Sequence, residues 1–344
     1  MQEEIIYLHP RSAFHLGERG IGLEETAEFI HADTLHAALS VAWATLYGRE
    51  RLEQDFLRPG DPPVLFSSAL PFAGPVRFYP RPFLPLPPGM TGHQDMRTLR
   101  ALKDVAYVSE GILRLHLEGQ AYPVDTTLHQ GRVLLLPEEA ESLKDLLRRR
   151  SLENVAFWAI TRAPRVAVDV ARFHSNIWHF GRITFHQHAG FFLRVRYRDE
   201  RVANMFRAAV RLLGDMGIGG DRSSGHGLFD VTFDTAPPLG NIRAERFITL
   251  SPLYPKREEI PNLVGEDARY QWITRRGWIG SMAATPYRRR TVTMFAEGSL
   301  LTGQADHVWG DLVDVTPLEV SPPLPHRIYR YGYAFPIGVP PWEQ

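Results

Sequence analysis

Glycine is concentrated in one short stretch, and this stretch restricts the possible folds most strongly. Five of the eleven residues from Gly217 to Gly227 are glycine. Ordering a glycine costs more backbone entropy than ordering other residues, so something must offset that cost. Consecutive amides can form a concave surface that binds anions. Arg222 adds a guanidinium suited to phosphate, and Ser223 and Ser224 add hydroxyl groups. We therefore predict that a sugar-phosphate chain lies against this loop.

The surroundings of the loop exclude two familiar phosphate-binding motifs. A Walker A loop and a Rossmann fingerprint both lead from a strand into a helix. Here residues 201–216 have helical apolar spacing before the loop, and Leu228–Phe233 alternates like a strand after it. A flexible connector between helix and strand is the alternative interpretation of the same residues.

The order of the expected elements indicates an α+β fold. They are a strand at 4–9, a helix at 33–47, strands at 155–160, 165–170 and 191–197, a helix at 201–216 and a strand at 228–233. This is the βαββαβ, or RRM-like, order of a ferredoxin-like domain with a large insertion after its first helix. We expect a first domain at 1–238, with the insertion at about 53–152, and a second ferredoxin-like domain at 239–344.

The insertion itself contains few clear elements. Seven prolines lie between Pro71 and Pro88, and proline disfavours both helix and sheet interior. Gly111–Leu117 is a candidate strand, and Glu138–Arg149 is a candidate helix.

Composition narrows the function classes. The chain has no cysteine, which excludes a disulfide framework, a thiolate zinc site and a cysteine nucleophile. It has 39 basic and 39 acidic residues, which argues against a uniformly basic surface but allows a local basic groove. No signal-peptide pattern follows Met1, and no apolar run approaches the roughly 18 residues of a membrane span. We expect a cytoplasmic protein with no membrane partner.

Several further segments carry a family resemblance. They are Phe14–Thr26 and His31–Leu35 near the start, and Met294–Ser299, Gly310–Pro317 and Tyr329–Gly332 in the C-terminal half. With the glycine-rich loop, they resemble the RAMP superfamily. Within it they are most similar to the Csm-type subunit of type III-A CRISPR complexes that binds the crRNA 5′ handle.

This resemblance implies a non-catalytic RNA-binding subunit without metal or cofactor. Such a subunit caps the crRNA 5′ handle and bridges the large signalling subunit to the backbone RAMP subunit in antiviral defence. It also implies a β-hairpin thumb at about 166–185 that interrupts the guide–target RNA duplex. The residues expected near the thumb tip are His174, Asn176, Ile177 and Trp178.

The residues predicted to bind RNA fall into three groups. They are Phe14, His15, Gly17, Glu18, Arg19 and Gly20; His31 and Asp33; and Gly217, Ile218, Gly219, Gly220, Arg222, Ser223, Ser224, Gly225, His226 and Gly227. Phe14 or His15 is expected to stack on a base.

Two other functions remain open. His31, His36 and Asp33 could serve a metal-independent endoribonuclease that processes precursor crRNA. We favour a helix N-cap role for Asp33. A scaffold that contacts mainly protein is the third possibility.

Two charged or metal-binding motifs carry less weight. His186 and His188 could form a metal pair, but no third ligand is apparent. The run Arg288–Arg290 could face RNA, a partner protein or solvent.

Overall fold

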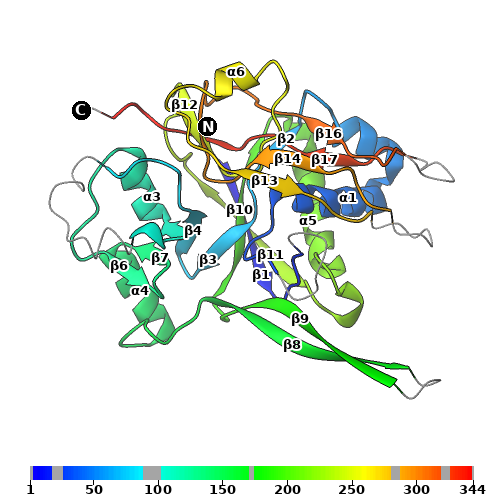
Figure 1. Cartoon of the computed structure of the whole chain (residues 1–344), viewed down its shortest axis with the longest axis horizontal. Helices are drawn as coiled ribbons and strands as arrows, with labels where there is room; N and C mark the ends of the chain where they lie inside the picture. The colour runs from blue at the N-terminus through cyan, green and yellow to red at the C-terminus, as the bar shows by residue number, and fades with distance from the viewer. Residues whose placement is uncertain are drawn as a thin grey trace.

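The protein is an α+β structure with a large mixed sheet, which confirms the predicted fold class. A computed structural model describes residues 3–17, 26–87, 102–169, 174–279, 287–318 and 326–342, except for the side chains of 165–169 and 174–178. Figure 1 shows a central sheet with two helices on one face, a lobe built by the insertion, and a long two-stranded hairpin that extends away from the body.

The N-terminal strand lies inside the sheet, not at its edge. Strand β1 (Glu3–Pro10) pairs antiparallel with both β10 (Ala189–Tyr197) and β11 (Phe229–Ala236). On its other side β10 pairs with β2 (Val64–Phe66) and β3 (Leu70–Ala73). The sheet continues in the order β3, β4 (Val76–Pro80), β5 (Tyr107–Ser109), β7 (Val133–Leu135) and β6 (Thr127–His129), which makes nine strands within the described residues.

Two amphipathic helices cover one face of this sheet. Helix α1 (Ala32–Asp55) packs against α5 (Ala203–Met216), as Figure 1 shows. Their buried apolar side chains include Leu35, Leu39 and Trp43 from α1, and Phe206, Val210 and Leu213 from α5. Gly48 has φ 82° and ψ 170°, so the regular helix is interrupted where the sequence predicted its end.

Two strands that follow the predicted start of the insertion, at about residue 53, lie in the main sheet. Strands β2 and β3 belong to the main sheet, because both pair with β10. Pro71 is tolerated in β3 because it pairs with Phe191 on the β10 side only. Toward β4 only Phe72 and Ala73 pair, so the missing proline N–H is not needed there.

Within the insertion one prediction is wrong and one is confirmed. The candidate strand at 111–117 is helix α3 (Glu110–Leu117), whose buried residues follow helical spacing. The Ser109 side chain caps it by accepting a hydrogen bond from the Ile112 amide at 3.2 Å. The predicted helix at 138–149 is α4 (Pro137–Leu147).

The hairpin is longer and more regular than the sequence suggested. Strands β8 (Trp158–Asp169) and β9 (His174–Phe185) each have twelve residues and pair along their whole length. The two strands expected at 155–160 and 165–170 are therefore parts of β8. At the end nearest the body, Ile183 of β9 forms an isolated bridge with Phe14.

A fully buried arginine joins distant segments inside the sheet. The Arg194 guanidinium lies 2.5 Å from the Glu3 carboxylate and 3.4 Å from the Glu110 carboxylate. It also donates to the Tyr79 hydroxyl at 3.0 Å and to the Pro237 carbonyl at 2.6 Å. A buried charge is tolerated only when it is paired, and here every partner comes from a different part of the chain.

The C-terminal half consists of small sheets. They are β12 (Arg246–Thr249) with β15 (Leu300–Thr302) and β18 (Pro336–Gly338), β13 (Trp272–Arg275) with β14 (Val292–Phe295), and β16 (Leu312–Asp314) with β17 (Tyr329–Tyr331). In the described part of this half the only α-helix is α6 (Ile260–Leu263). From the C-terminal half, the side chains of Ile248, Leu250 and Phe335 join the main apolar core. The predicted domain boundaries and the second ferredoxin-like domain stay predictions.

No described helix combines the length and apolar character that crossing a lipid bilayer requires.

Candidate nucleic-acid interface

The glycine-rich loop begins where α5 ends. The Gly217 residue has φ +75°, which ends the helix, and its amide donates to the Leu213 carbonyl at 2.8 Å. Ile218 is buried, and its amide donates to the Gly227 carbonyl at 3.0 Å. The two ends of the loop are therefore pinned to each other.

Several glycines of the loop are required by packing within the protein. Gly219 has φ +94°, and a Cβ there would collide with the His15 carbonyl oxygen. Gly227 has φ +80°, and a Cβ there would collide with the Ile218 carbonyl oxygen. The Gly220 amide donates to the His15 carbonyl at 2.9 Å, and the Gly227 amide to the Ala13 carbonyl at 2.8 Å. Part of the entropic cost is therefore offset inside the molecule, without any ligand.

The tip of the loop, Arg222–Gly225, behaves differently. Its four residues are exposed. The residues Arg222–Ser224 form a single 3₁₀ turn, and Gly225 has φ +79° with no atom near the position of a Cβ. The tip thus offers a guanidinium and two hydroxyls on one small surface, while the Ser224 and Gly225 amides donate within the turn itself. This surface is suited to phosphate oxygens.

The segment 13–17 lies beside the loop, but its rings point inward. Phe14 is fully buried and packs edge-on against Phe191 at 5.3 Å. It has no exposed face for a base, so the predicted stacking role of Phe14 is contradicted. The His15 ring is also buried: it lies 4.3 Å from the Phe180 ring, and its Nδ1 lies 2.6 Å from the Gly181 carbonyl.

The remaining predicted residues of this segment differ in what is described. Gly17 is exposed, with open space around it. Glu18, Arg19 and Gly20 lie outside the described residues. In the loop, the half-buried His226 places its ring 5.6 Å from Phe180.

The residues His31 and Asp33 face the C-terminal half and not the loop. The His31 Nδ1 lies 2.7 Å from a Glu297 carboxylate oxygen. The Asp33 side chain is completely buried and pairs with Arg275, at 2.9 Å, and with Arg330. Burial acts to raise the pKa of Asp33, but these two guanidinium groups outweigh it and hold the pKa well below its usual range.

Two predictions for Asp33 therefore change. Helix α1 starts after His31, which makes no side-chain cap hydrogen bond, so Asp33 is not an N-cap residue. Its carboxylate is also closed off from any RNA strand, because its exposed fraction is zero. The ion pairs explain both observations, since a buried carboxylate between two arginines has its acceptor sites occupied.

The predicted thumb coincides in sequence with the β8–β9 hairpin. The residues His174, Asn176, Ile177 and Trp178 lie in β9 near its distal end, where Asn176 pairs with Ala167. Their side chains lie outside the described part of the structure, so their proposed contacts stay predictions.

The arginine run at 288–290 does not form a single basic surface. Arg288 stacks over the Trp278 ring at 4.6 Å. The half-buried Arg289 faces the Asp33 cluster, and burial lowers its pKa. The Arg290 guanidinium donates to the Asp314 carbonyl. These side chains therefore have three different environments.

The pair His186 and His188 stays a weak metal candidate. Their ring centroids are 5.7 Å apart. Among the described residues, no group of three or more histidine, aspartate or glutamate side chains is arranged to hold a metal ion.

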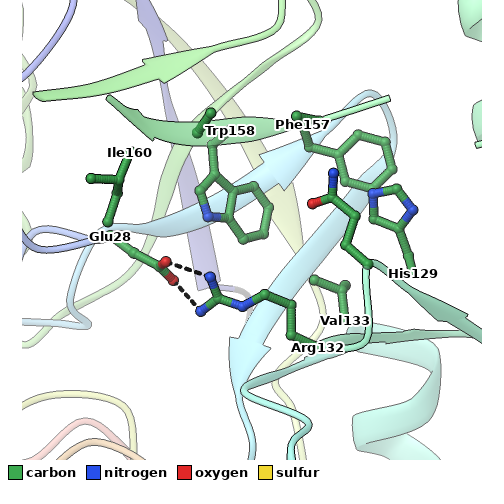
Figure 2. Close-up of a pocket in the computed structure, with 10 residues that line it drawn as sticks. Glu28, His129, Arg132, Val133, Phe157, Trp158 and Ile160 are labelled. Carbon is green, nitrogen blue, oxygen red and sulfur yellow. Dashed lines mark hydrogen bonds and ion pairs between the residues drawn. The ribbon is translucent and has the colours of Figure 1, made fainter. Parts of the chain in front are cut away.

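Sequence reasoning missed the hairpin root, which we define as residues 157–160, at the start of β8, and residues 180–185 of β9. Ile183 bridges to Phe14 on one side and pairs with Ile160 on the other. A cavity of about 350 Å³ lies beside this root, as Figure 2 shows. It is lined by Glu28, His129, Gln130, Arg132, Val133 and residues 156–160. No local pattern signals it, because its walls come from three separate segments.

Comparisons with known proteins give a consistent picture. Residues 243–339 match the family described as the CRISPR Csm4 C-terminal domain. A Thermococcus onnurineus protein named CRISPR system Cms protein Csm4 is 27% identical over 310 residues, which cover 90% of this chain and 91% of the relative. A Mycobacterium tuberculosis protein of the same name is 24% identical over 95% of this chain and 94% of the relative.

Two solved structures share the fold. A chain of the Csm3-Csm4 subcomplex in the type III-A CRISPR-Cas interference complex superposes with a TM-score of 0.69 at 17% identity, over 99% of this chain and all of that one. A chain of the Csm1-Csm4 cassette in complex with cA4 gives a TM-score of 0.60 at 21% identity, over the full length of both.

Proposed function

We propose that this chain is a Csm4-type RAMP subunit and that it binds the crRNA 5′ handle in a type III-A CRISPR complex, as its similarity to Csm4 proteins suggests. Its role is structural: it caps the guide RNA and does not cut it. The single observation that carries this proposal is the exposed loop tip, where Arg222, Ser223, Ser224 and Gly225 form a phosphate-sized polar surface on a rigid base. Contacts to phosphate fix the register of a nucleic acid, as capping an end requires.

The proposed assembly rests on the same similarity. The solved relatives are named in assemblies with Csm1 and with Csm3. We propose that this chain likewise bridges the large signalling subunit and the backbone subunit, in the cytoplasm. The β8–β9 hairpin would act as the thumb near the target RNA, since it projects from the body beside the loop (Figure 1).

The strand order supports the proposed domain type. In the N-terminal half the order is β11, β1, β10 and then β2 with β3, all antiparallel, with α1 and α5 packed on one face. This matches a βαββαβ ferredoxin-like unit in which β2 and β3 share the second strand position.

The endoribonuclease alternative is less well supported. A general acid or base must come within hydrogen-bond reach of the RNA. Asp33 is enclosed by arginines, His31 is held by Glu297, and the buried His36 has its pKa lowered by burial to about 3. Specific cleavage of precursor crRNA by the purified chain in chelator, lost in His31→Ala, would support the enzyme instead.

The proposal is tested by Arg222→Ala. Loss of this phosphate contact should weaken binding of a labelled handle RNA and reduce the slope of log K against log salt by about 1. The free energy of unfolding should stay within about 0.5 kcal/mol of wild type, since Arg222 is exposed. Fluorescence anisotropy at several salt concentrations and urea unfolding measure these effects.

The matched control is Arg49→Ala, which removes an exposed arginine of α1 whose partner is Glu53. It should leave RNA affinity and salt slope unchanged. If Arg222→Ala binds with wild-type affinity and slope, the loop tip is not the RNA site.

A further inference from the structure

The cavity beside the hairpin root plays no part in the function proposed above. Its volume of about 350 Å³ lies within the range of small-ligand pockets. Its walls come from the β6–β7 turn, the start of β8 and the segment before α1 (Figure 2). The fold therefore creates this space by bringing the insertion against the hairpin root.

The walls of the cavity favour a flat ligand. Phe157, Trp158 and His129 supply three aromatic rings. The His129 ring lies 4.4 Å from Phe157, and Trp158 lies beside them with its indole over the cavity (Figure 2). Aromatic side chains stack on bases with little dependence on sequence.

The charge of the cavity favours a neutral ligand. Arg132 is held by Glu28 through two hydrogen bonds of 2.6 and 2.7 Å, so its charge is matched (Figure 2). Burial lowers the pKa of His129, although the Val155 carbonyl opposes this, so burial disfavours the charged form of the ring. A phosphate would find no unmatched cation on this wall.

One buried atom on the wall has an unused hydrogen-bonding capacity. His129 is only 3% exposed, and its Nε2 has no hydrogen-bond partner among the described residues. Such an atom costs free energy unless water or a ligand meets it. Because His129 lines the cavity, a bound molecule is in position to supply the missing partner.

The neighbouring residue is held in an unfavourable conformation. Gln130 has φ 49° and Gly131 has φ 69° in a turn closed by the Arg132 amide and the His129 carbonyl at 3.1 Å. The first central position of such a two-residue turn is usually glycine, asparagine or aspartate. A glutamine kept there despite the strain indicates a function for its side chain. Its amide nitrogen donates to the Val155 carbonyl at 3.5 Å, which leaves the amide oxygen and a second N–H to meet a ligand at the cavity.

We infer that this cavity takes one unstacked nucleobase of the bound RNA strand. The Gln130 amide and the His129 Nε2 meet the edge of the base, and Trp158 lies against its face. This inference rests on the proposed function, which brings single-stranded RNA to the loop tip. RNA-binding proteins commonly splay single-stranded bases into such pockets.

The position of the cavity suits this occupant. Segment 13–17 bridges to β9 through Ile183, and β9 pairs with β8, whose start lines the cavity. Two strand spacings, roughly 10 Å, therefore separate the segment beside the glycine loop from the cavity. The glycine-rich loop also contacts the hairpin root, because the His226 ring lies 5.6 Å from the Phe180 ring.

The test is Gln130→Gly, which relieves the backbone strain and removes the amide. The melting temperature should rise by about 1–3 °C. Affinity for fluorescein-labelled single-stranded RNA ten-mers should fall about fivefold to tenfold for at least one of oligo-A, oligo-U and oligo-C. Affinity for a ten-mer of abasic ribose phosphate should not change. A merely structural residue would not separate stability from base-dependent binding in this way.

Two controls define the result. Gln120→Gly makes the same substitution at an exposed residue that does not line the cavity, and it should leave every RNA affinity at its wild-type value. Gln130→Asn keeps an amide and tolerates positive φ, so it should retain part of the base dependence.

If Gln130→Gly binds all base-containing ten-mers with wild-type affinity, the inference about the cavity is wrong. The proposed role of the loop tip is tested separately by Arg222→Ala. Unchanged RNA binding with weaker capture of the partner subunits would assign the cavity to a protein segment, which also overturns it. If the wild-type chain binds no ten-mer, the proposed function and this inference both fail.

Discussion

The first turn of α1 and the tip of the glycine loop were both predicted to bind RNA, yet their charges face opposite environments. At the loop tip Arg222 lies in solvent, on a turn whose base is pinned by Gly217 and Gly227. At α1 the Asp33 carboxylate is completely buried between Arg275 and Arg330. The first arrangement leaves a charge available to a partner molecule, and the second uses its charge to join two halves of the protein.

The difference shows that the role of a charged residue depends on whether another segment of the chain neutralises it. A sequence pattern shows a charge and its neighbours, but not whether another segment will neutralise it. The α1 site receives its arginines from more than 240 positions further along the chain. Arg222 at the loop tip is exposed instead, so its charge faces solvent.

The substitution Asp33→Ala should have the largest effect and tests whether the buried ion pairs hold the two halves of the protein together. Removing the carboxylate leaves Arg275 and Arg330 buried without their counter-charge, which should lower the free energy of unfolding by about 3–5 kcal/mol. Chemical denaturation of the purified chain measures it. Asp215→Ala, which removes the exposed partner of Arg11, should change stability by less than about 1 kcal/mol.

A small effect of Asp33→Ala would mean that the Asp33 carboxylate is not needed to hold the two arginines. The contrast with the loop tip would then fail.

Acid should reveal the same buried region through His36. Its ring lies 4.9 Å from Phe56, its Nδ1 has no partner among the described residues, and burial lowers its pKa to about 3, against an opposing effect of Asp33. The unfolded chain binds a proton near pH 6.5, so between about pH 6.5 and 3 unfolding takes up a proton and stability falls as the pH falls. From pH 7 to 4.5 this amounts to about 2–3 kcal/mol.

The measurement is urea unfolding at pH 7, 6, 5 and 4.5 for wild type and His36→Phe. The variant keeps an aromatic ring but cannot titrate, so its stability should fall less on acidification. Parallel pH profiles for the two proteins would show that His36 is not the group responsible.

Within the loop, two glycines allow a comparison between its packed base and its exposed tip. Gly219→Ala adds a Cβ that collides with the His15 carbonyl, whereas Gly225→Ala adds one in open space. Both positions have positive φ, so each loses about 1 kcal/mol through the backbone, and Gly219→Ala should lose about 1–2 kcal/mol more. Thermal unfolding compares the two.

Binding should show the reverse order of importance. Gly225→Ala adds a methyl group at the exposed tip and should lower RNA affinity, although it has the smaller loss of stability of the two variants. Equal stability losses in the two variants would mean that the base of the loop is no more rigid than its tip.

Local pattern predicted the elements next to the glycine loop well. Residues of α5 and β11 have clear helical and alternating periods, because each buries one face against the sheet. The pattern failed at Pro71. Proline has no N–H, and its place in β3 depends on which neighbouring strand would need a hydrogen bond from that position. It failed again at 111–117. A short alternating run there favoured a strand, but the residues form a helix that the Ser109 side chain caps.

The candidate site was only partly predictable for the same reason. The exposed tip at Arg222–Gly225 follows from local chemistry. The burial of Phe14 depends on Phe191, and the cavity depends on the β6–β7 turn meeting the start of β8. Such long-range contacts have no signature in a single sequence.

The buried Arg194 has a consequence for how the protein is made. Glu3 leaves the ribosome early, but its guanidinium partner is synthesised 191 residues later, and β11 follows later still. Strand β1 therefore stays unpaired, and Glu3 stays without its arginine partner, until most of the chain has emerged from the ribosome. Contacts so distant along the chain are slow to form. During translation, β1 therefore completes its pairing only after β10 and β11 have been made.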